Sequence, residues 1–299
     1  MAANLKEVRE RISSVNSTQQ ITKAMKMVSA AKLRKAQDAI TRLRPYSSKL
    51  EEMMGNLLAG LEGDTTTVYN QKRKPERVLM VVVTSNRGLC GAFNSNVIKA
   101  AMKKIETDYA AFRDSGDLVI ACIGKRGHDF FKNRFKKVKI VDDYVDMFSD
   151  LSFRNVSRLS RLIMSRFADE KYDLVDIVYG SFKNAGVQLP VVEPFLPVDP
   201  VKATKALEDD DPGADYIIEP SKEELVKEMV PTILQIQFHK CLLDTHAAEH
   251  AARMTAMDKA TENANDLLKD LKIHYNKARQ ESITGELLEI VAGADALGS

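Results

Sequence analysis

Apolar residues recur at steps of three and four through the last third of the chain, from residue 221 to about residue 296. The positions are Met229, Ile233, Ile236, Leu243, Ala247, Met254, Met257, Ala264, Leu268, Leu271, Tyr275 and Ala278. A heptad-like repeat sustained over so many turns predicts a coiled-coil helix about 110 Å long. Ser221 and Glu224 have the form of a capping box, and Pro231 is expected to kink or restart the helix.

A second periodic stretch covers residues 3 to about 61. One heptad frame contains Leu5, Val8, Ile12, Val15, Leu33, Ala36, Ile40, Leu43, Leu50, Met54, Leu57 and Leu61. Between Gln19 and Ser29 the frame is expected to slip, and the apolar stripe to move to Ile21, Ala24, Met25 and Val28. Pro45 is expected to interrupt this helix, and Gly55 and Gly60 to weaken its end.

We expect the two terminal stretches to pair as one antiparallel coiled coil, because a compact segment between them must bring the chain back. The alternative is two unrelated long helices. A helix far longer than a compact domain needs a partner along its apolar stripe.

The central residues change to a different pattern. Apolar, β-branched runs predict strands over residues 77–85, 118–123, 138–141, 174–179 and 187–192. Helical patterns fall at residues 95–112, 125–135 and 153–168, and loops at residues 62–76 and 199–220. Strands that alternate with helices predict a mostly parallel, Rossmann-like sheet with helices on both faces. The predicted fold class is therefore α/β, with a coiled coil of residues 1–61 and 221–296 and a central domain of residues 77–198.

Charge and cysteine content narrow the function classes. The chain has 299 residues with a net charge of +2, so no bulk attraction to nucleic acid or anionic lipid is expected. The first fifty residues are more basic, with eleven Lys or Arg against three Asp or Glu. That excess fits either a solvated helix face or an acidic partner. Three widely spaced cysteines predict reduced thiols, and no stretch is long and apolar enough to span a membrane.

The predicted first strand-to-helix turn offers little for nucleotide chemistry. Gly88 and Gly91 lack the Gly-x-Gly-x-x-Gly spacing that lets backbone amides approach a pyrophosphate. Residues 124–127 (GKRG) lack the Walker A frame and are interpreted as a turn that opens a helix. Cys90 follows a glycine near a helix start and could act as a nucleophile, but a small thiol in a tight turn is the favoured interpretation. We expect no catalytic residue and no bound cofactor.

Metal-ligating patterns are equally sparse. His246 and His250 are four residues apart on the C-terminal helix, a spacing that can hold a metal ion, but no third ligand is placed with them. The acidic run Asp209 to Asp211 precedes Pro212 and Gly213, as in a solvated surface loop. No metal site is predicted. The residues taken alone describe a long helical pair with an α/β domain, which suits a mechanical or positioning role.

Three motifs nevertheless resemble one family. Residues 276–280 (NKARQ) lead into residues 283–294 (ITGELLEIVAGA), which resemble the signature Ile-Thr-x-Glu-x-x-Glu followed by Gly-Ala in gamma subunits of F-type ATP synthases. Residues 21–28 (ITKAMKMV), continuing to Lys32, and residues 87–91 (RGLCG) are similar to the same family. The matches lie in order at the start, middle and end of the chain. Departures are Asn86, where the family often has Asp, and the lack of the cysteine-bearing insertion of chloroplast relatives.

The resemblance implies a central rotor shaft, without catalytic sites, in a proton-translocating ATP synthase. It implies the alpha and beta subunits, the epsilon subunit and the membrane ring of c subunits as partners. The implied location is the cytoplasmic face of a bacterial inner membrane. The competing interpretations are a nucleotide-dependent α/β enzyme with a coiled-coil arm, and a nucleic-acid binder that uses the basic N-terminal helix.

The resemblance also implies roles for single residues. Arg279, Gln280 and Thr284 match positions that contact a beta-subunit loop, and an apolar shaft tip would consist of Ile283, Leu287, Leu288, Ile290 and Val291. The family contact with an acidic beta-subunit lever would lie near Lys23, Met25, Lys26 and Lys32, with Arg87 and Cys90 in the same neighbourhood. Tyr216 and Glu219 would belong to the foot on the rotor ring and epsilon.

Overall fold

A computed structural model describes residues 5–59, 68–71, 73–198 and 222–297. The chain forms two compact units, one of residues 1–29 with 253–299 and one of residues 30–252, and each unit is described by itself. Ser221, the acidic run at residues 209–211, Tyr216 and Glu219 lie outside the described residues. The three-part division at residues 61, 77, 198 and 221 stays a prediction.

Two very long helices contribute to both units, α1 (Leu5–Ala59) and α7 (Lys222–Leu297). The prediction that Pro45 interrupts the N-terminal helix is wrong, because α1 continues through this proline. Helix α7 likewise continues through Pro231 without a restart. A proline removes one backbone N–H from the helix. The loss is tolerated because the neighbouring apolar side chains on both helices, such as Leu50, Met229 and Leu234, are packed into the core of the second unit.

The second unit contains a five-stranded sheet of β1 (Val78–Val83), β2 (Leu118–Ile123), β3 (Lys139–Val141), β4 (Leu174–Asn184) and β5 (Val187–Leu196). The strand order is β3-β2-β1-β4-β5. The first four strands are parallel, and β5 pairs antiparallel with β4. Both hairpin strands are longer than predicted, because the Asn184 side chain accepts hydrogen bonds from Gly186 N and Val187 N and closes a tight turn.

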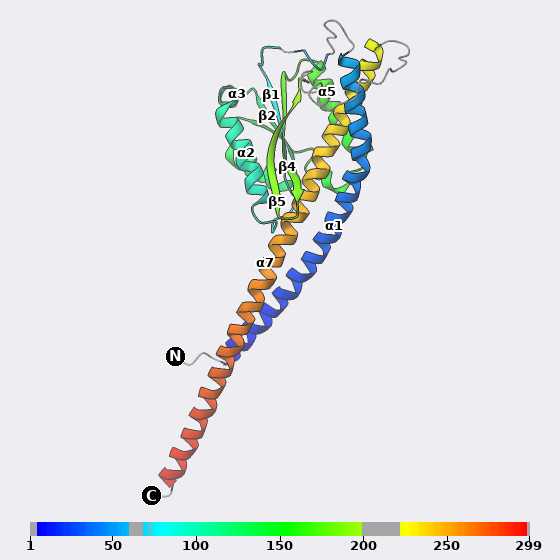
Figure 1. The fold of residues 1–299 in the computed structure, drawn as a ribbon. Coiled ribbons are helices and arrows are strands. Elements are labelled where there is room, and N and C mark those ends of the chain that lie inside the picture. The colour runs from blue at the N-terminus through cyan, green and yellow to red at the C-terminus, as the bar shows by residue number, and fades with distance from the viewer. Residues whose placement is uncertain (1–4, 60–67, 72, 199–221, 298–299) are drawn as a thin grey trace. The chain divides into compact units, whose positions relative to one another are not determined.

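Helices cover both faces of this sheet (Figure 1). One face packs against α5 (Phe153–Ala168) and the part of α7 within this unit. The other packs against α2 (Phe93–Thr107) and α4 (Lys125–Arg134). Every residue of β1 is buried, as expected for a strand covered on both sides. The α/β fold class with long terminal helices is confirmed.

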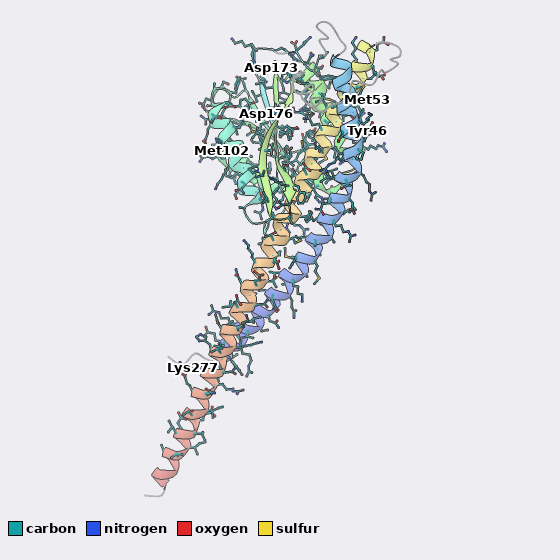
Figure 2. The ribbon with its side chains drawn as sticks, viewed as in Figure 1. Tyr46, Met53, Met102, Asp173, Asp176 and Lys277 are labelled. Carbon is teal, nitrogen blue, oxygen red and sulfur yellow. The ribbon has the colours of Figure 1, made fainter. Side chains whose placement is uncertain are left out.

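The predicted helix over residues 95–112 is divided into α2 and α3 (Ala110–Ser115). The break places the buried Tyr109 hydroxyl 2.6 Å from Asp176 Oδ2, to which it donates a hydrogen bond. Asp176 is a buried carboxylate of β4 (Figure 2). Lys104 Nζ lies 3.7 Å from the same oxygen. A buried charge needs such partners, so the sheet determines where the helix ends.

Candidate interaction surfaces

In the first unit, the predicted slip of the heptad frame does not occur. The alternation of three and four continues from Val15 through Gln19, Thr22, Lys26 and Ser29, and Thr22 and Ser29 are buried. The prediction of an apolar stripe was wrong, because Ile21 and Val28 are 59% and 55% exposed. The heptad spacing of the seam positions therefore continues, but the side chains at these positions change from apolar to polar.

Three polar pairs join the two helices across this part of the seam, and a fourth lies nearer the start of α1. Gln19 donates to Asn265, and Lys26 forms an ion pair with Asp258. The Thr22 and Thr261 hydroxyl oxygens lie 2.8 Å apart, and Arg9 Nη2 donates to Tyr275 Oη over 2.9 Å. The hydrogen bond from Arg9 holds the pKa of the Tyr275 hydroxyl below its usual value. As numbers rise along α1 they fall along α7, so the predicted antiparallel pairing is confirmed within this unit.

We predict that this polar part of the seam fixes the register of the two helices, as single polar core positions do in coiled coils. Changing Gln19, Thr22, Thr261 and Asn265 together to Leu should raise the melting temperature of the helical signal. It should also permit pairings shifted by one heptad. In the unmodified background, Arg9→Cys should form a disulfide with Tyr275→Cys but hardly with Leu268→Cys. If, in the Leu variant, Arg9→Cys still formed a disulfide with Tyr275→Cys and hardly with Leu268→Cys, the polar pairs would not fix the register.

The residues of α1 that are predicted to contact a partner differ in their exposure to solvent. Lys23 is exposed, while Met25 and Lys26 are partly buried and the Lys26 ammonium already pairs with Asp258. Lys32, which belongs to the second unit, is exposed. In the first unit, Lys23 therefore offers the more accessible positive charge of these predicted contacts.

Helix α7 is exposed on nearly all sides after Ala278, the last buried seam position. Arg279, Gln280 and Thr284 are exposed, and apolar side chains remain in water: Ile283, Leu287, Leu288, Ile290 and Val291, between 49% and 67% exposed. This exposed end begins about 30 Å along the helix from Asp258, at 1.5 Å per residue. Within the first unit, the predicted contacts near Lys23 and Lys26 are thus separated along the coiled coil from those after Ala278. Contiguous exposed apolar side chains usually mark an interaction surface.

The turn after β1 holds the other two predicted contacts, in the second unit. Arg87 is exposed, whereas Cys90 is only 2% exposed. Asn94 Nδ2 lies 3.2 Å from Cys90 Sγ, and Ser85 Oγ donates to Arg87 O over 2.6 Å. The preferred interpretation of Cys90, a small thiol in a tight turn, fits this buried position. All three cysteines are free and buried, and their reduced state stays a prediction.

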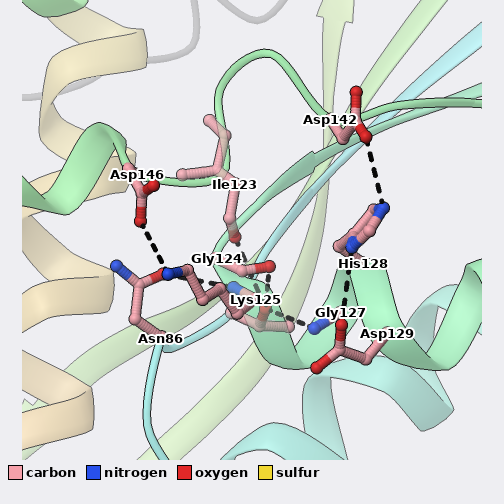
Figure 3. Close-up of polar contacts among 10 residues, drawn as sticks. Asn86, Ile123, Gly124, Lys125, Gly127, His128, Asp129, Asp142 and Asp146 are labelled. Carbon is pink, nitrogen blue, oxygen red and sulfur yellow. Dashed lines mark hydrogen bonds and ion pairs between the residues drawn. The ribbon is translucent and has the colours of Figure 1, made fainter.

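The carboxyl ends of β1 and β2, where Rossmann-like folds bind phosphates, are occupied by the protein's own groups (Figure 3). At the start of α4, Lys125 N donates to Asn86 Oδ1 over 3.1 Å and Arg126 N to Ser85 O over 3.2 Å. Gly127 N donates to Thr84 Oγ1 over 2.8 Å. These first amides of a helix are the ones that would bind an anion. The predicted turn at residues 124–127 is confirmed, and its amides already have partners.

Neighbouring charges close the same edge. Lys125 Nζ lies 3.4 Å from Asp146, and the His128 ring lies between Asp129 and Asp142 at 3.5 and 3.6 Å (Figure 3). The first amides of α4 thus lie among side chains of α4 itself and of the two segments that follow β1 and β3. This arrangement stabilises a turn and leaves little room for a phosphate.

The histidines of α7 pack rather than gather ligands. His250 is buried and its Nε2 lies 3.0 Å from His246 Nε2, while the His246 ring stacks on Phe148. Burial lowers the pKa of His239, whose Nε2 lies 2.9 Å from Leu151 O. Among the described residues, no group of three His, Cys, Asp or Glu side chains is placed to hold a metal ion. None of the described helices combines the length and apolarity needed to cross a bilayer.

A half-buried carboxyl on α7 makes the second unit sensitive to pH. Burial, with Glu193 nearby, raises the pKa of Asp244 to about 6 against the opposing charges of Lys240 and Arg44. Because the folded state then holds a proton that the unfolded state loses near pH 4, stability falls as pH rises from about 4 to 6. Asp244→Asn should remove this loss and raise the unfolding free energy by about 1 to 2 kcal/mol above pH 6.

Denaturant unfolding of both chains at pH 4 and pH 8 tests this prediction. The gain from Asp244→Asn should shrink to about half a kcal/mol or less at pH 4, where the carboxyl is protonated in the folded state and about half ionised in the unfolded state. Glu193→Gln should give a smaller gain, because the Tyr179 hydroxyl and the Gln237 amide already hydrogen-bond to the Glu193 carboxylate at 2.7 and 2.6 Å. If the stability difference between Asp244→Asn and the unmodified chain were the same at both pH values, a raised Asp244 pKa would be ruled out.

The polar seam and the bonded α4 amides were missed by sequence reasoning. The signal for the seam was present, because the heptad spacing between Val15 and Leu33 holds once Thr22, Lys26 and Ser29 are accepted as core positions. The α4 amides carried no such signal, since backbone groups do not differ between residues.

Comparison with known proteins covers almost the whole chain. The sequence profile of a family described as ATP synthase matches residues 4–297. The ATP synthase gamma chain of Cytophaga hutchinsonii is 49% identical over 296 residues, and that of Christiangramia forsetii is 50% identical over 295 residues. Each comparison covers 99% of both chains.

Solved structures share the fold at lower identity. A chain of the Euglena gracilis mitochondrial ATP synthase, solved with OSCP, F1 and c-ring, aligns with a TM-score of 0.65 and 23% identity, covering 98% of this chain and 94% of that one. A chain of the central stalk and c-ring of the Tetrahymena thermophila enzyme aligns with a TM-score of 0.55 and 22% identity, covering 80% and 99%. The chain belongs to the family of ATP synthase gamma chains, the central-stalk rotor subunit.

Proposed function

We propose that this chain turns as a non-catalytic shaft and couples rotation of a proton-driven membrane ring to ATP synthesis on alpha and beta subunits. The observation that carries the proposal is the exposed apolar end of α7, beyond the last buried seam residue Ala278. A helix end with five exposed large apolar side chains suits a surrounding apolar sleeve. Apolar contacts are not directional, so such a tip can turn without being held at one angle.

The polar residues at the start of this end would contact a beta-subunit loop. Arg279, Gln280 and Thr284 are exposed, and their hydrogen bonds can be exchanged as the helix turns. Lys23 and Lys32 would meet an acidic lever of beta, with Met25 beside them. Lys26 would reach it only by sharing its ion pair with Asp258. Arg87 would act from its exposed turn, while buried Cys90 would support that turn rather than touch a partner.

The membrane side of the assembly would involve epsilon and the ring of c subunits. Tyr216 and Glu219 remain proposed contacts there. We place the chain on the cytoplasmic face of a bacterial inner membrane, as its bacterial relatives suggest. The bonded amides of α4 support the absence of a nucleotide site on this chain.

Replacing Arg279 and Gln280 together with Ala tests the loop contact. In a complex reconstituted with alpha and beta subunits from the same source, ATP hydrolysis should fall about tenfold, since two polar contacts to charged or amide groups contribute about 1 to 2 kcal/mol. Both side chains are exposed, so the melting temperature of the isolated chain should not change. Unaltered hydrolysis would remove these residues from the contact.

The runner-up function, a nucleotide-dependent enzyme, has a direct test. Saturable binding of ATP to the isolated chain, lost on Arg87→Ala, would support that function against the shaft.

A further inference from the structure

The outer face of α5 carries an arginine row that no described intrachain contact explains. Arg154, Arg158 and Arg161 are exposed on one face, while the opposite face is buried against the sheet. Within the described ranges, no carboxylate lies within 4.0 Å of their guanidinium groups. Arg161 donates to Ser157 of its own helix over 3.2 Å.

This row does not serve the helix itself. Like charges three and four residues apart, as in Arg154 with Arg158 and Arg158 with Arg161, destabilise a helix by about 0.2 to 0.5 kcal/mol a pair. The row also begins in the first turn of α5, where the helix dipole disfavours cations and no acidic residue is present. The arginine row therefore lowers the stability of α5. We take this as a sign that the row binds a group outside the chain.

Apolar groups accompany the row. Phe153 and Leu162 are 42% and 36% exposed beside it. Leu162 also lines a small hollow of about 20 Å³, with Tyr144, Arg166 and Tyr172, which has room for about one water molecule. A ligand that combines negative charge with an apolar side chain would match both features.

Carboxylate side chains flank the arginine row at both of its ends. Asp150 accepts a hydrogen bond from Ser152 N over 2.9 Å, at the start of α5. Asp169 and Glu170, both exposed, follow its end. The basic face from Arg154 to Arg161 is therefore only about 10 Å long. An extended polyanion or a flat anionic membrane would meet the flanking carboxylates, whereas a short acidic segment would not.

We infer that this face, formed by Phe153, Arg154, Arg158, Arg161, Leu162 and Arg166, is a docking surface for a short acidic segment of a partner protein with one apolar anchor. The carboxylates of the segment pair with the guanidinium row, and the anchor packs on the exposed surface of Leu162. The inference is independent of the shaft function, because it concerns a surface of the second unit that the proposed alpha, beta and ring contacts do not use.

Binding of a labelled synthetic helical peptide to the full chain tests the inference. The peptide carries Glu at every fourth position on one face and one central Leu. We expect saturable binding that weakens about tenfold or more in the triple variant Arg154→Glu, Arg158→Glu, Arg161→Glu. A peptide with Lys in place of Glu should then bind the variant better than it binds the unmodified chain.

Controls separate this surface from general basicity. The triple variant Lys132→Glu, Arg134→Glu, Lys136→Glu reverses three exposed charges elsewhere in the second unit and should leave peptide binding unchanged. Phe153→Ala with Leu162→Ala should weaken binding without altering its salt dependence. Circular dichroism should confirm that each variant keeps its helical content; if the Glu triple variant does not fold, Arg154→Gln, Arg158→Gln, Arg161→Gln replaces it.

Several outcomes would overturn the inference. One is no peptide binding at millimolar concentration, and another is an equal loss of binding in both triple variants. Vesicles of phosphatidylglycerol or a single-stranded oligonucleotide binding at the arginine row more tightly than the peptide would assign the face to a lipid or a nucleic acid instead.

Discussion

Leu287→Asp combined with Ile290→Asp should lower ATP synthesis by the reconstituted enzyme by about tenfold or more, because an unpaired charge in an apolar sleeve costs several kcal/mol. Both side chains are more than half exposed in the chain alone. The isolated chain should therefore keep its melting temperature. The measurement is proton-driven ATP synthesis in vesicles, with ATP hydrolysis recorded in parallel.

The same helix provides a matched control. Ile273 is 66% exposed and lies outside the proposed tip, so Ile273→Asp places one such charge on α7 at a comparably exposed apolar position. Its effect on synthesis should be small. If Ile273→Asp were as harmful as the tip variant, the location of the tip would be wrong. If neither variant affected synthesis, this helix end would have no apolar sleeve.

Gly124→Ala should destabilise the second unit by about 3 kcal/mol or more, the range of severe steric and backbone strain. Gly124 has a φ of +98°, and a Cβ at this position would lie 2.0 Å from the carbonyl oxygen of Thr84. Its N–H also donates to Val145 O over 3.1 Å. The substitution should move the start of α4 away from β1 and break the hydrogen bond between Gly127 N and Thr84 Oγ1. Denaturant unfolding measures the loss.

Two other glycines separate backbone strain from the steric clash. Gly116 has a φ of +91°, but the nearest atom to an added Cβ is 3.9 Å away, so Gly116→Ala should cost about 1 kcal/mol. At Gly285, within α7, nothing lies within 4 Å. Gly285→Ala should therefore favour the helix by about 0.5 to 1 kcal/mol. A Gly124→Ala variant as stable as Gly116→Ala would mean that α4 is not held close to β1.

The heptad spacing predicted both terminal helices and the buried apolar positions of their seam as far as Ala278. It missed a second buried stripe of α7, which includes Leu234, Phe238 and Leu242, because this stripe packs into the core of the second unit. It failed between Gln19 and Ser29, because hydrophobicity was taken as the mark of the seam. In the structure, Thr22 and Ser29 are buried there, and Ile21 and Val28 face water. Small polar side chains that find partners across the seam satisfy the same geometry, so spacing was the better guide than hydrophobicity.

The strands of the sheet were predictable because β-branched runs such as residues 78–83 are buried on both faces. The break before Tyr109 was not, since it depends on the Asp176 carboxylate sixty-seven residues away along the chain. The tip residues were proposed from the family motif, and the exposed apolar side chains of Leu287 and Ile290 are compatible with that proposal. Long-range partners and backbone amides leave no local pattern for sequence reasoning to detect.

Rotation of this chain relative to the alpha–beta head is the measurement that tests the shaft most directly. The head is fixed to a surface, and a bead is attached through Ala185→Cys, which lies in the exposed β4–β5 turn and away from the three buried native cysteines. With ATP supplied, we expect the bead to turn continuously in one direction, in steps that follow ATP hydrolysis. A head that hydrolyses ATP at full rate while the bound chain stays still would contradict the account.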